Sequence, residues 1–340
     1  MSETGYRSPE DHLEEEYREH HEYEDEAVEA VVVAGTAGEF DVVEEGAGLF
    51  KDAWKDIRKR KLFWVAAVLI GIFTLMAIVP QLFVAPSPAT HNPRDCSLRN
   101  RETGEFQDLL TPSSEHWFGT DIQGCDYYAR VIYGAKVSII IGIGGTLILL
   151  IIGIVLGGIA GFYGGAADAL IGRFVDILFA FPFLIAAFLF MDLIAGESSR
   201  NEWHVLVFIG MFGWAILSRI FRGAVLQAKE KEYVESAVAL GASRLRILFR
   251  HIFPNAFAPA FVYAMIGIGG IIGAEAALSF LGIGLELPAI SWGLMINNAQ
   301  DRIIDTPHLL MFPGLFLSLT VLGFLLLGDV VRDALDPRMR

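Results

Sequence analysis

Few side chains in this sequence have a type and position that could take part in chemistry. The two cysteines, Cys96 and Cys125, could form a disulfide or remain free thiols. Two acidic residues, Asp176 and Glu275, stand within or beside strongly apolar stretches. A charged side chain is costly in such a place unless it meets a partner or water. Each acid therefore either holds neighbouring groups together or faces a polar pathway.

The common catalytic motifs are absent from the sequence. There is no G-x-x-x-x-G-K-[ST] phosphate-binding loop, no H-E-x-x-H zinc motif and no G-x-S-x-G nucleophile elbow. No Cys/His cluster has the spacing of a structural zinc site. We therefore expect a protein that is not an enzyme and has no metal site. Three histidines, His12, His20 and His21, lie among acids, but a solvated tail is a better interpretation than a metal site.

Charge is distributed very unevenly along the chain. Residues 1–50 contain 16 acidic and 2 basic residues, a net of −14, which equals the formal charge of the whole protein. Such a segment cannot bury enough apolar surface to fold alone, so we predict a disordered acidic tail. The remainder is balanced and has no basic excess that would predict nucleic-acid binding. Because the N-terminus is acidic and the first apolar run begins only at Leu62, no secretory signal peptide is expected.

The apolar content of 54% is too high for an ordinary soluble protein. Six apolar runs follow the tail, each close to the roughly 20 residues that a helix needs to cross a bilayer. Because helices are the only plausible spans for such runs, we predict an all-α integral membrane protein with six transmembrane helices. Their expected positions are Leu62–Phe83, Val137–Gly161, Val175–Ala195, His204–Ile220, Phe257–Leu281 and Leu309–Gly328.

The basic residues predict an orientation. Lysines and arginines precede the first run, fill the loop after the fourth run and follow the sixth. An even number of spans places these three groups and both termini on one side, which the positive-inside rule identifies as the cytoplasm. The long segment 84–130, which contains both cysteines, is then external.

The loop after the fourth run has the pattern of a helical hairpin. Val234, Ala237 and Val238 recur at helical spacing, and Gly241 suits the left-handed C′ position that ends a helix. Ser243 is a natural N-cap for a second helix, and Pro254 is expected to end that helix. The apolar stripe of this second helix is Leu245, Leu248 and Ile252. We therefore predict two short helices between two transmembrane runs.

This hairpin resembles the coupling loop of bacterial ABC-importer permeases, the element that docks into a groove on the ATPase subunit. The residues that match its E-A-A-x-x-x-G motif and closing proline are Glu235, Ala237, Gly241 and Pro254, whereas Ser236, His251 and Phe253 depart from it. The ending H-x-x-P-N is similar to that of the peptide and nickel branch of the family.

The resemblance extends over residues 51–340. Segments similar to the C-type permease subunit of oligopeptide and dipeptide importers occur in the expected order at 116–139, 161–182, 278–284, 291–293 and 332–338. The family implies a type I ABC-importer permease fold. Its expected parts are the tail (1–50), the first transmembrane helix with the external loop (51–135) and a five-helix core (136–340) that contains the coupling loop (222–256).

The resemblance also implies a function and partners. The chain is expected to be the membrane-spanning subunit of an ATP-driven peptide importer in the bacterial inner membrane. Its expected partners are a homologous second permease subunit, one or two ABC ATPase subunits, an extracytoplasmic substrate-binding protein and a peptide substrate. ATP and Mg would be bound by the ATPase, and no cofactor by this chain. The alternatives are an importer of nickel or another small solute, or a secondary transporter, although no inverted repeat is visible.

Roles for single residues follow from the same resemblance. The expected coupling residues are Glu235, Ser236, Ala237, Gly241, Ala242, Ser243 and Pro254. Glu275 could contact a peptide amine in the pathway or satisfy backbone in a glycine-rich helix, and Asp176 could instead pair with Arg173 or with a neighbouring helix. The family usually carries Arg at the position of Cys125, and an oxidising exterior favours a disulfide between Cys125 and Cys96 over two free thiols.

Overall fold

The computed structural model of the protein describes residues 53–84, 96, 98, 104, 106–195 and 199–335. All of them belong to one compact unit, residues 46–340, and the acidic tail with its three histidines lies outside the described residues. Their secondary structure is helical, apart from an isolated β-bridge between Thr120 and Asp126. The predicted all-α fold is confirmed.

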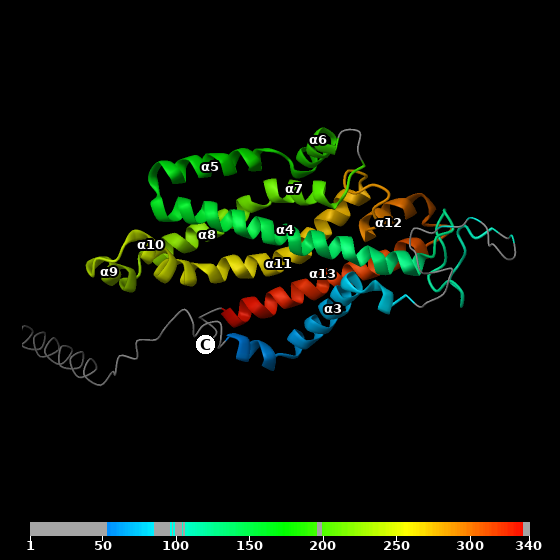
Figure 1. The fold of residues 1–340 in the computed structure, drawn as a ribbon, viewed down its shortest axis with the longest axis horizontal. Coiled ribbons are helices and arrows are strands. Elements are labelled where there is room, and N and C mark those ends of the chain that lie inside the picture. The colour runs from blue at the N-terminus through cyan, green and yellow to red at the C-terminus, as the bar shows by residue number, and fades with distance from the viewer. Residues whose placement is uncertain are drawn as a thin grey trace, which may run out of the picture. The chain divides into compact units, whose positions relative to one another are not determined.

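Within the described residues, five helices are long and apolar enough to cross a membrane, and a sharply bent helix pair would make a sixth span if it counts as one. Figure 1 shows the long helix α4 beside α8 and α11. The described helices that build the body are α3 (Lys61–Ile78), α4 (Tyr127–Tyr163), α5 (Gly165–Ala180), α6 (Phe183–Ala195), α7 (Glu202–Phe212), α8 (Trp214–Lys229), α9 (Glu232–Ala239), α10 (Arg244–Arg246), α11 (Phe253–Phe280), α12 (Trp292–Ala299) and α13 (His308–Leu335).

Glycines let α4 and α8 approach each other closely. A Cβ atom at Gly157 would lie 2.4 Å from the carbonyl oxygen of Ser218, and one at Gly161 would lie 2.9 Å from the side chain of Val225. Neither position could carry a larger side chain without separating the helices, as is typical of small residues at transmembrane helix contacts.

The third apolar run is not the single helix Val175–Ala195 that the sequence predicts. Helices α5 and α6 meet at an angle of 91°. The break lies at Phe181, which is extended (φ −86°, ψ 123°) because it precedes Pro182, and a proline disfavours helical backbone in the residue before it. Gly164 and Gly165 both have positive φ, so the chain reverses after α4 and α5 begins earlier than predicted.

The start of the second span was also predicted wrongly. Helix α4 begins at Tyr127 rather than Val137, so part of the stretch assigned to the external loop is helical. Asp126 is its N-cap, and the carboxylate accepts a hydrogen bond of 2.9 Å from the N–H of Ala129. This cap satisfies a backbone donor that would otherwise lack a partner in the first turn.

Candidate functional site

Helix α9 forms the first arm of the predicted hairpin and ends as the sequence indicates. Gly241 has φ +77°, and its N–H donates to the carbonyl of Val238. The N–H of Ala242 donates to the carbonyl of Ala237 at 3.0 Å. These two bonds form a Schellman motif, with Gly241 at the left-handed C′ position. The prediction for the backbone at Gly241 is confirmed.

The second arm begins as predicted but does not end at Pro254. The side chain of Ser243 accepts a hydrogen bond from the N–H of Arg246, so Ser243 is an N-cap. From there α10, a π-helical segment (Ile247–Ile252) and α11 continue as one apolar helix, Arg244–Phe280. The prediction that Pro254 stops this helix is therefore wrong.

Two features let the chain continue through Pro254. This residue stands in the first turn of α11, where its missing N–H is not needed. The preceding turn is widened, because the N–H of Phe253 donates to the carbonyl of Leu248, five residues back. The amide of Asn255 then donates to the carbonyl of His251 at 2.7 Å. The second arm is thereby an extension of a transmembrane helix.

The inner face of the hairpin packs on the body. Val234 and Ala237 of α9 are buried together with Ile247 and Ile252 of the second arm. They form one cluster with buried residues of α8, including Phe221. A shared core of this kind makes the two arms one unit with the end of α8.

A lysine adds polar contacts to the packing of this unit on α4. The Nζ atom of Lys229, the last residue of α8, donates to the carbonyl oxygens of Gly161 at 3.3 Å and Phe162 at 3.0 Å. Both carbonyls belong to the last turn of α4, where a helix leaves acceptors without a partner. A displacement of the hairpin would therefore be transmitted to α4 as well as to α11.

The outer face of the hairpin exposes large apolar side chains. Leu240 is 88% exposed and Phe249 is 64% exposed, and Val238 and Leu245 are also exposed. Large side chains left uncovered in this way mark a surface that a partner protein or lipid covers. We refer to Val238, Leu240, Leu245 and Phe249 as the hairpin knob.

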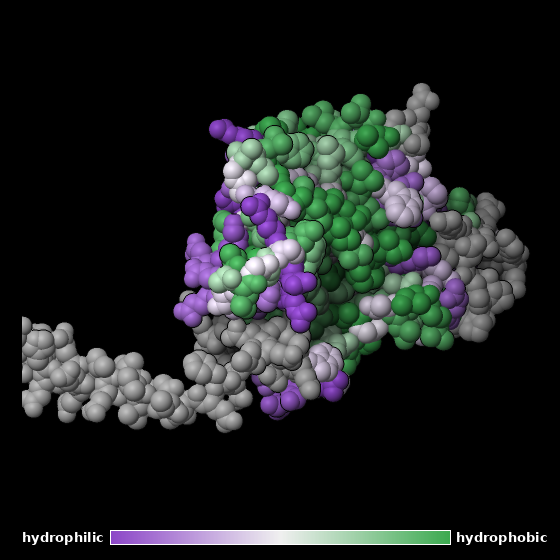
Figure 2. Space-filling view, turned by 60° about the vertical axis from the view of Figure 1, so that its left-hand side comes forward, coloured by the Kyte–Doolittle hydropathy of each residue, from purple (hydrophilic) through white to green (hydrophobic). Residues whose placement is uncertain are grey.

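Leu240 and Phe249 were not predicted as functional residues. Val238 and Leu245 belong to the predicted apolar stripes of the two arms, and both are exposed. One feature of the sequence could have indicated an exposed apolar surface: the second arm contains more apolar residues than a single buried stripe requires. The same two arms also carry exposed charged residues, among them Glu232, Glu235, Arg244, Arg246 and Arg250. Figure 2 shows hydrophilic residues gathered toward the left of one face of the body, beside a broad hydrophobic area.

Glu275 has no exposed surface. Its carboxyl group accepts hydrogen bonds from the hydroxyls of Ser138 (3.2 Å), Ser279 (3.0 Å) and Ser291 (2.9 Å). These serines lie on α4, on α11 and at the N-cap of α12. Hydroxyl donors from three elements thus satisfy the hydrogen-bonding capacity of this buried acid. The geometry therefore favours a structural role for Glu275 over contact with a peptide amine in the pathway.

Asp176 lies on α5 and pairs with Arg219 of α8 at 2.5 Å. The sequence left two partners open for Asp176, and the observed partner is the neighbouring helix rather than Arg173. A second acid on α5, Asp168, makes a bidentate pair with Arg222 of α8 at 2.5 and 2.6 Å. Sequence reasoning missed this pair, because its members are far apart in the chain.

The two pairs border a groove of about 400 Å³ between α4, α5 and α8. Gly157 and Gly172 contribute to its walls, and so does Arg173, for which the described residues provide no ion-pair partner. Both members of the Asp176–Arg219 pair are more than half exposed. Charges at this position of a membrane span need an aqueous space or a partner helix.

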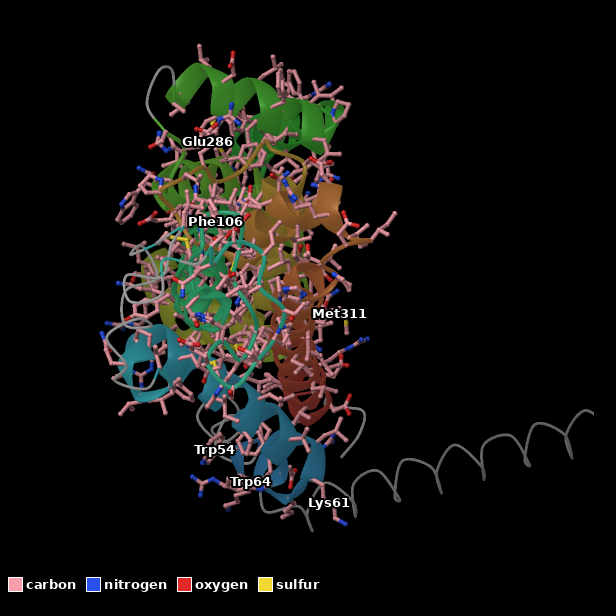
Figure 3. The ribbon with its side chains drawn as sticks, turned by 90° about the vertical axis from the view of Figure 1, so that its right-hand side faces the viewer. Trp54, Lys61, Trp64, Phe106, Glu286 and Met311 are labelled. Atoms are coloured by element: carbon pink, nitrogen blue, oxygen red, sulfur yellow. A yellow bond between two sulfur atoms is a disulfide. The ribbon has the colours of Figure 1, made fainter. Side chains whose placement is uncertain are left out.

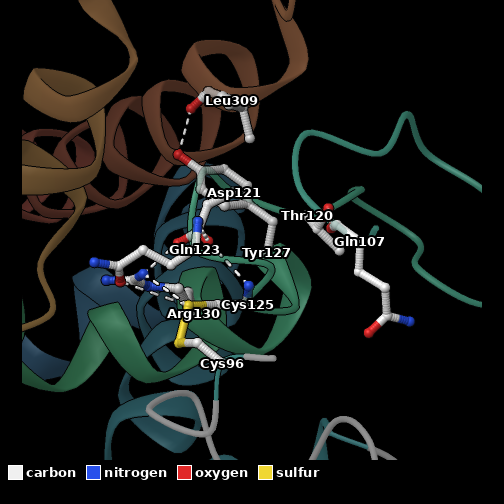
Figure 4. Close-up of polar contacts among 9 residues, drawn as sticks. All are labelled: Cys96, Gln107, Thr120, Asp121, Gln123, Cys125, Tyr127, Arg130 and Leu309. Atoms are coloured by element: carbon white, nitrogen blue, oxygen red, sulfur yellow. Dashed lines mark hydrogen bonds and ion pairs between the residues drawn. A yellow bond between two sulfur atoms is a disulfide. The ribbon is translucent and has the colours of Figure 1, made fainter. Parts of the chain in front are cut away.

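The segment that precedes α4 is held to the start of that helix by a compact polar cluster (Figure 4). The sulfur atoms of Cys96 and Cys125 are bonded, and their Cα atoms are 4.2 Å apart. The carboxylate of Asp121 accepts from the N–H of Cys125 and forms a buried ion pair with Arg130 of α4. Asp126, besides capping α4, contacts the ring of His116 at 2.9 Å.

This cluster has no metal-binding character. Among the described residues, no group of three or more His, Cys, Asp or Glu could hold a metal ion.

Comparison with known proteins gives two family matches. Residues 153–340 match the binding-protein-dependent transport system inner membrane component family. Residues 48–101 match the N-terminal TM domain of oligopeptide transport permease C.

Several curated proteins are similar over most of their length. The dipeptide transport system permease protein DppC of Alkalihalophilus pseudofirmus is 39% identical over 86% of this chain and 90% of its own. The oligopeptide transport system permease protein OppC of Bacillus subtilis is 36% identical over 90% of this chain and 96% of its own. The glutathione transport system permease protein GsiD of Pectobacterium atrosepticum is 38% identical over 84% of this chain and 92% of its own.

Proposed function

Because this chain belongs to the binding-protein-dependent transport system inner membrane component family, we propose that it is the membrane-spanning permease subunit of an ATP-driven peptide importer. The observation that carries the proposal is the hairpin: an exposed apolar knob on a unit that packs on α8 and continues into α11. A surface of this kind suits a partner that pushes or pulls on the permease.

The similar proteins favour peptides as the cargo. The three relatives described above are named for the transport of dipeptides, oligopeptides and glutathione, all of which contain peptide or peptide-like bonds. Nickel ion would require donor groups of a different kind, and no cluster of metal-binding side chains occurs in the described residues. Peptide is therefore the cargo that we propose, and nickel is the alternative.

In the proposed mechanism, nucleotide binding and hydrolysis take place on ABC ATPase subunits, which also hold ATP and Mg. The ATPase binds the hairpin knob, and Glu235 and the arginines of the hairpin fix the orientation of the bound ATPase. Movement of the hairpin passes to α11 through the continuous helix and to α4 through Lys229. The bundle then changes between two packed states, and nucleotide biases the equilibrium between them.

A second, homologous permease chain completes the pathway in this proposal. The charged groove between α5 and α8 supports it, because exposed ion pairs beside apolar helices need cover or water. The pathway between two such chains would supply both the cover and the water. Asp176 is then a pathway residue through its pair with Arg219, whereas Glu275 acts on the position of α12. An extracytoplasmic binding protein would deliver peptide to the face that carries the disulfide.

This scheme places the hairpin and both termini in the cytoplasm and the body in the bacterial inner membrane. The basic residues around the first span and in the hairpin support that orientation. Accessibility labelling of a cysteine introduced at Ser236 in intact and permeabilised cells would test it. Labelling of that cysteine in intact cells by a reagent that does not cross the membrane would contradict the orientation.

The proposed function is tested by substituting one knob residue. Leu240→Asp is expected to leave membrane insertion intact but to abolish co-purification of the ATPase, because a charge replaces the most exposed apolar side chain of the knob. A matched control is Ile304→Asp, which changes an equally exposed apolar residue outside the helices. Peptide uptake and ATPase retention by Leu240→Asp at the control level would contradict the proposal.

The secondary-transporter alternative makes the opposite prediction. Such a protein would carry cargo in liposomes without any ATPase and would need an ion gradient. Uptake by the reconstituted permease chains alone would favour it.

A further inference from the structure

An apolar groove lies at the end of the body where the described chain begins. The groove has a volume of about 350 Å³, and all of its lining side chains are apolar. They come from the helical residues 53–59, from the start of α3, and from α11 and α13. The lining residues are Ala53, Trp54, Ile57, Phe63, Phe261, Met265, Leu327, Val331 and Leu335. We call this cavity the N-terminal groove.

The N-terminal groove lies at the boundary of the membrane-spanning part. Helix α3, the first candidate span, begins at Lys61, directly after residues 53–60, and α13 ends at Leu335. Trp54 and Trp64 are both about half exposed beside it, and Figure 3 shows them with Lys61 at the same end of the body. Tryptophan is enriched where a membrane meets water, so the groove opens at the level of lipid headgroups.

The rim of the groove carries an excess of positive charge. Six basic residues stand on residues 53–61 and the last two turns of α13, against three acidic ones on the same segments. The basic residues are Lys55, Arg58, Lys59, Arg60, Lys61 and Arg332, and the acidic ones are Asp56, Asp329 and Asp333.

Two of the three acids are already paired. Asp56 pairs with Lys59 at 3.1 Å and Asp333 with Arg60 at 2.6 Å. Lys61 and Arg332 are exposed and make no ion pair within the described part of the chain. Because the Arg60–Asp333 pair brings the two segments together, their sequence neighbours Lys61 and Arg332 are two cations close to a cavity that has only apolar walls.

We propose that the N-terminal groove binds an anionic phospholipid, with an acyl chain along the apolar walls and the phosphate between Lys61 and Arg332. The combination of apolar walls and two exposed cations identifies the class of ligand. Free phosphate would gain nothing from the apolar walls, and a zwitterionic lipid would gain little from the two cations. Basic sites between helices at a membrane surface bind anionic headgroups for the same reason.

The chemistry of the walls argues against a peptide as the occupant. The acidic N-terminal tail of this chain would complement the cations, but its backbone would enter a cavity without a donor or acceptor. Each unpaired backbone group there would cost several kcal/mol, whereas an acyl chain has no such groups. The site would link residues 53–59, α11 and α13, so lipid composition would affect a helix that continues into the hairpin.

The experiment uses the full-length protein with its co-purified subunits, reconstituted in nanodiscs of phosphatidylcholine and phosphatidylglycerol in equal parts. Lipids that remain bound are counted by native mass spectrometry after release from the nanodisc. We expect preferential retention of phosphatidylglycerol. Lys61→Gln with Arg332→Gln removes two cations and is expected to weaken that retention roughly 30-fold.

Two further variants make the test specific. Lys136→Gln with Arg302→Gln removes the same charge from exposed residues away from the groove and is expected to retain phosphatidylglycerol like the unchanged protein. Met265→Trp fills the groove without changing charge and is expected to reduce retention. Thermal unfolding of each variant shows whether the fold is kept.

Several results would overturn the proposal. Equal retention of phosphatidylcholine would show unselective lipid contact, and unchanged retention in the Lys61/Arg332 variant would exclude the two cations. Full retention by a folded Met265→Trp protein would exclude the groove. Displacement of the lipid by inorganic phosphate would show that the site recognises phosphate alone.

Discussion

The hydroxyl of Ser291 donates a hydrogen bond of 2.9 Å to the buried carboxyl group of Glu275. The same hydroxyl oxygen accepts from the N–H of Leu294 at 3.2 Å, so it also caps α12. The first turn of α12 thus depends on an acid of α11, and Ser138 of α4 donates to that acid as well. The indole of Trp292 adds a bond of 2.9 Å to the carbonyl of Val131 on α4. Glu275 therefore holds three helices in one arrangement.

Replacing Glu275 by alanine is expected to destabilise the protein. The change removes the acceptor for three buried hydroxyls, and each buried polar group left without a partner costs about 1–3 kcal/mol. We expect a loss of at least about 3 kcal/mol in unfolding free energy, with Glu275→Gln less damaging because it keeps one acceptor oxygen. Thermal unfolding of the detergent-solubilised protein measures both.

An exposed acid outside the helices of the body provides the control for this series. Asp301→Asn also removes a carboxylate but should leave the unfolding midpoint unchanged, since Asp301 is exposed. A Glu275→Ala protein as stable as Asp301→Asn would contradict the structural role. A stable Glu275→Gln protein with normal folding and impaired peptide uptake would instead support a pathway contact.

Replacing Gly241 is expected to damage coupling more than folding. Its φ of +77° is strained for any residue with a Cβ, at about 1–2 kcal/mol, although no atom lies within 4 Å of the Cβ position. Gly241→Ala should therefore disturb the turn between the hairpin arms and lower peptide-stimulated ATPase activity. Gly241→Trp adds bulk on the open side and should abolish uptake while the protein still inserts. Both activities are measured in proteoliposomes.

The control is a glycine in ordinary helical backbone. Gly267 of α11 also has open space around its Cβ position but has no positive φ. Gly267→Ala should retain activity and stability, since alanine favours helix over glycine by up to about 1 kcal/mol. Equal loss of activity in both glycine variants would show that backbone strain at the turn is not the cause.

The sequence was sufficient for features that depend on local chemistry. The apolar runs predicted helices because backbone groups in lipid must be paired within the segment. The positive φ of Gly241 and the cap at Ser243 followed from residue type alone. Both are properties of a single turn, which a short window of sequence contains.

Features that depend on several segments could not be read in the same way. The sequence predicts that a helix ends at Pro254, but the widened turn before this residue lets the helix continue. Pro182, in contrast, produces a bend of 91° between α5 and α6. Nothing in the two local sequences indicates which proline the surrounding turns accommodate. The ion pair Asp168–Arg222 could not be predicted for a related reason, because only the packing of α5 on α8 brings the two residues together.

Exchanging the charges of Asp176 and Arg219 tests whether their pair matters for the pathway. An exposed pair contributes only about 0–1 kcal/mol, so Asp176→Arg alone should change the unfolding midpoint little. If the charges face the pathway, that variant should lower peptide uptake severalfold, and adding Arg219→Asp should restore part of it. Uptake by reconstituted complexes is the measurement. Normal uptake by Asp176→Arg would remove Asp176 from the pathway.

The disulfide gives the last prediction, and its two cysteines are not equivalent. Replacing either one by serine opens a loop that spans 29 residues, which favours the unfolded loop by on the order of 3 kcal/mol. Cys125→Ser should be the more damaging change, because the Cys125 sulfur is contacted by the guanidinium of Arg130 at 3.3 Å and Cys125 is buried, whereas Cys96 is only partly buried. Limited proteolysis of the purified protein should cut segment 106–126 faster in both variants and fastest in Cys125→Ser. Proteolysis at the unchanged rate in Cys96→Ser would show that hydrogen bonds and the Asp121–Arg130 pair hold the segment without the covalent link.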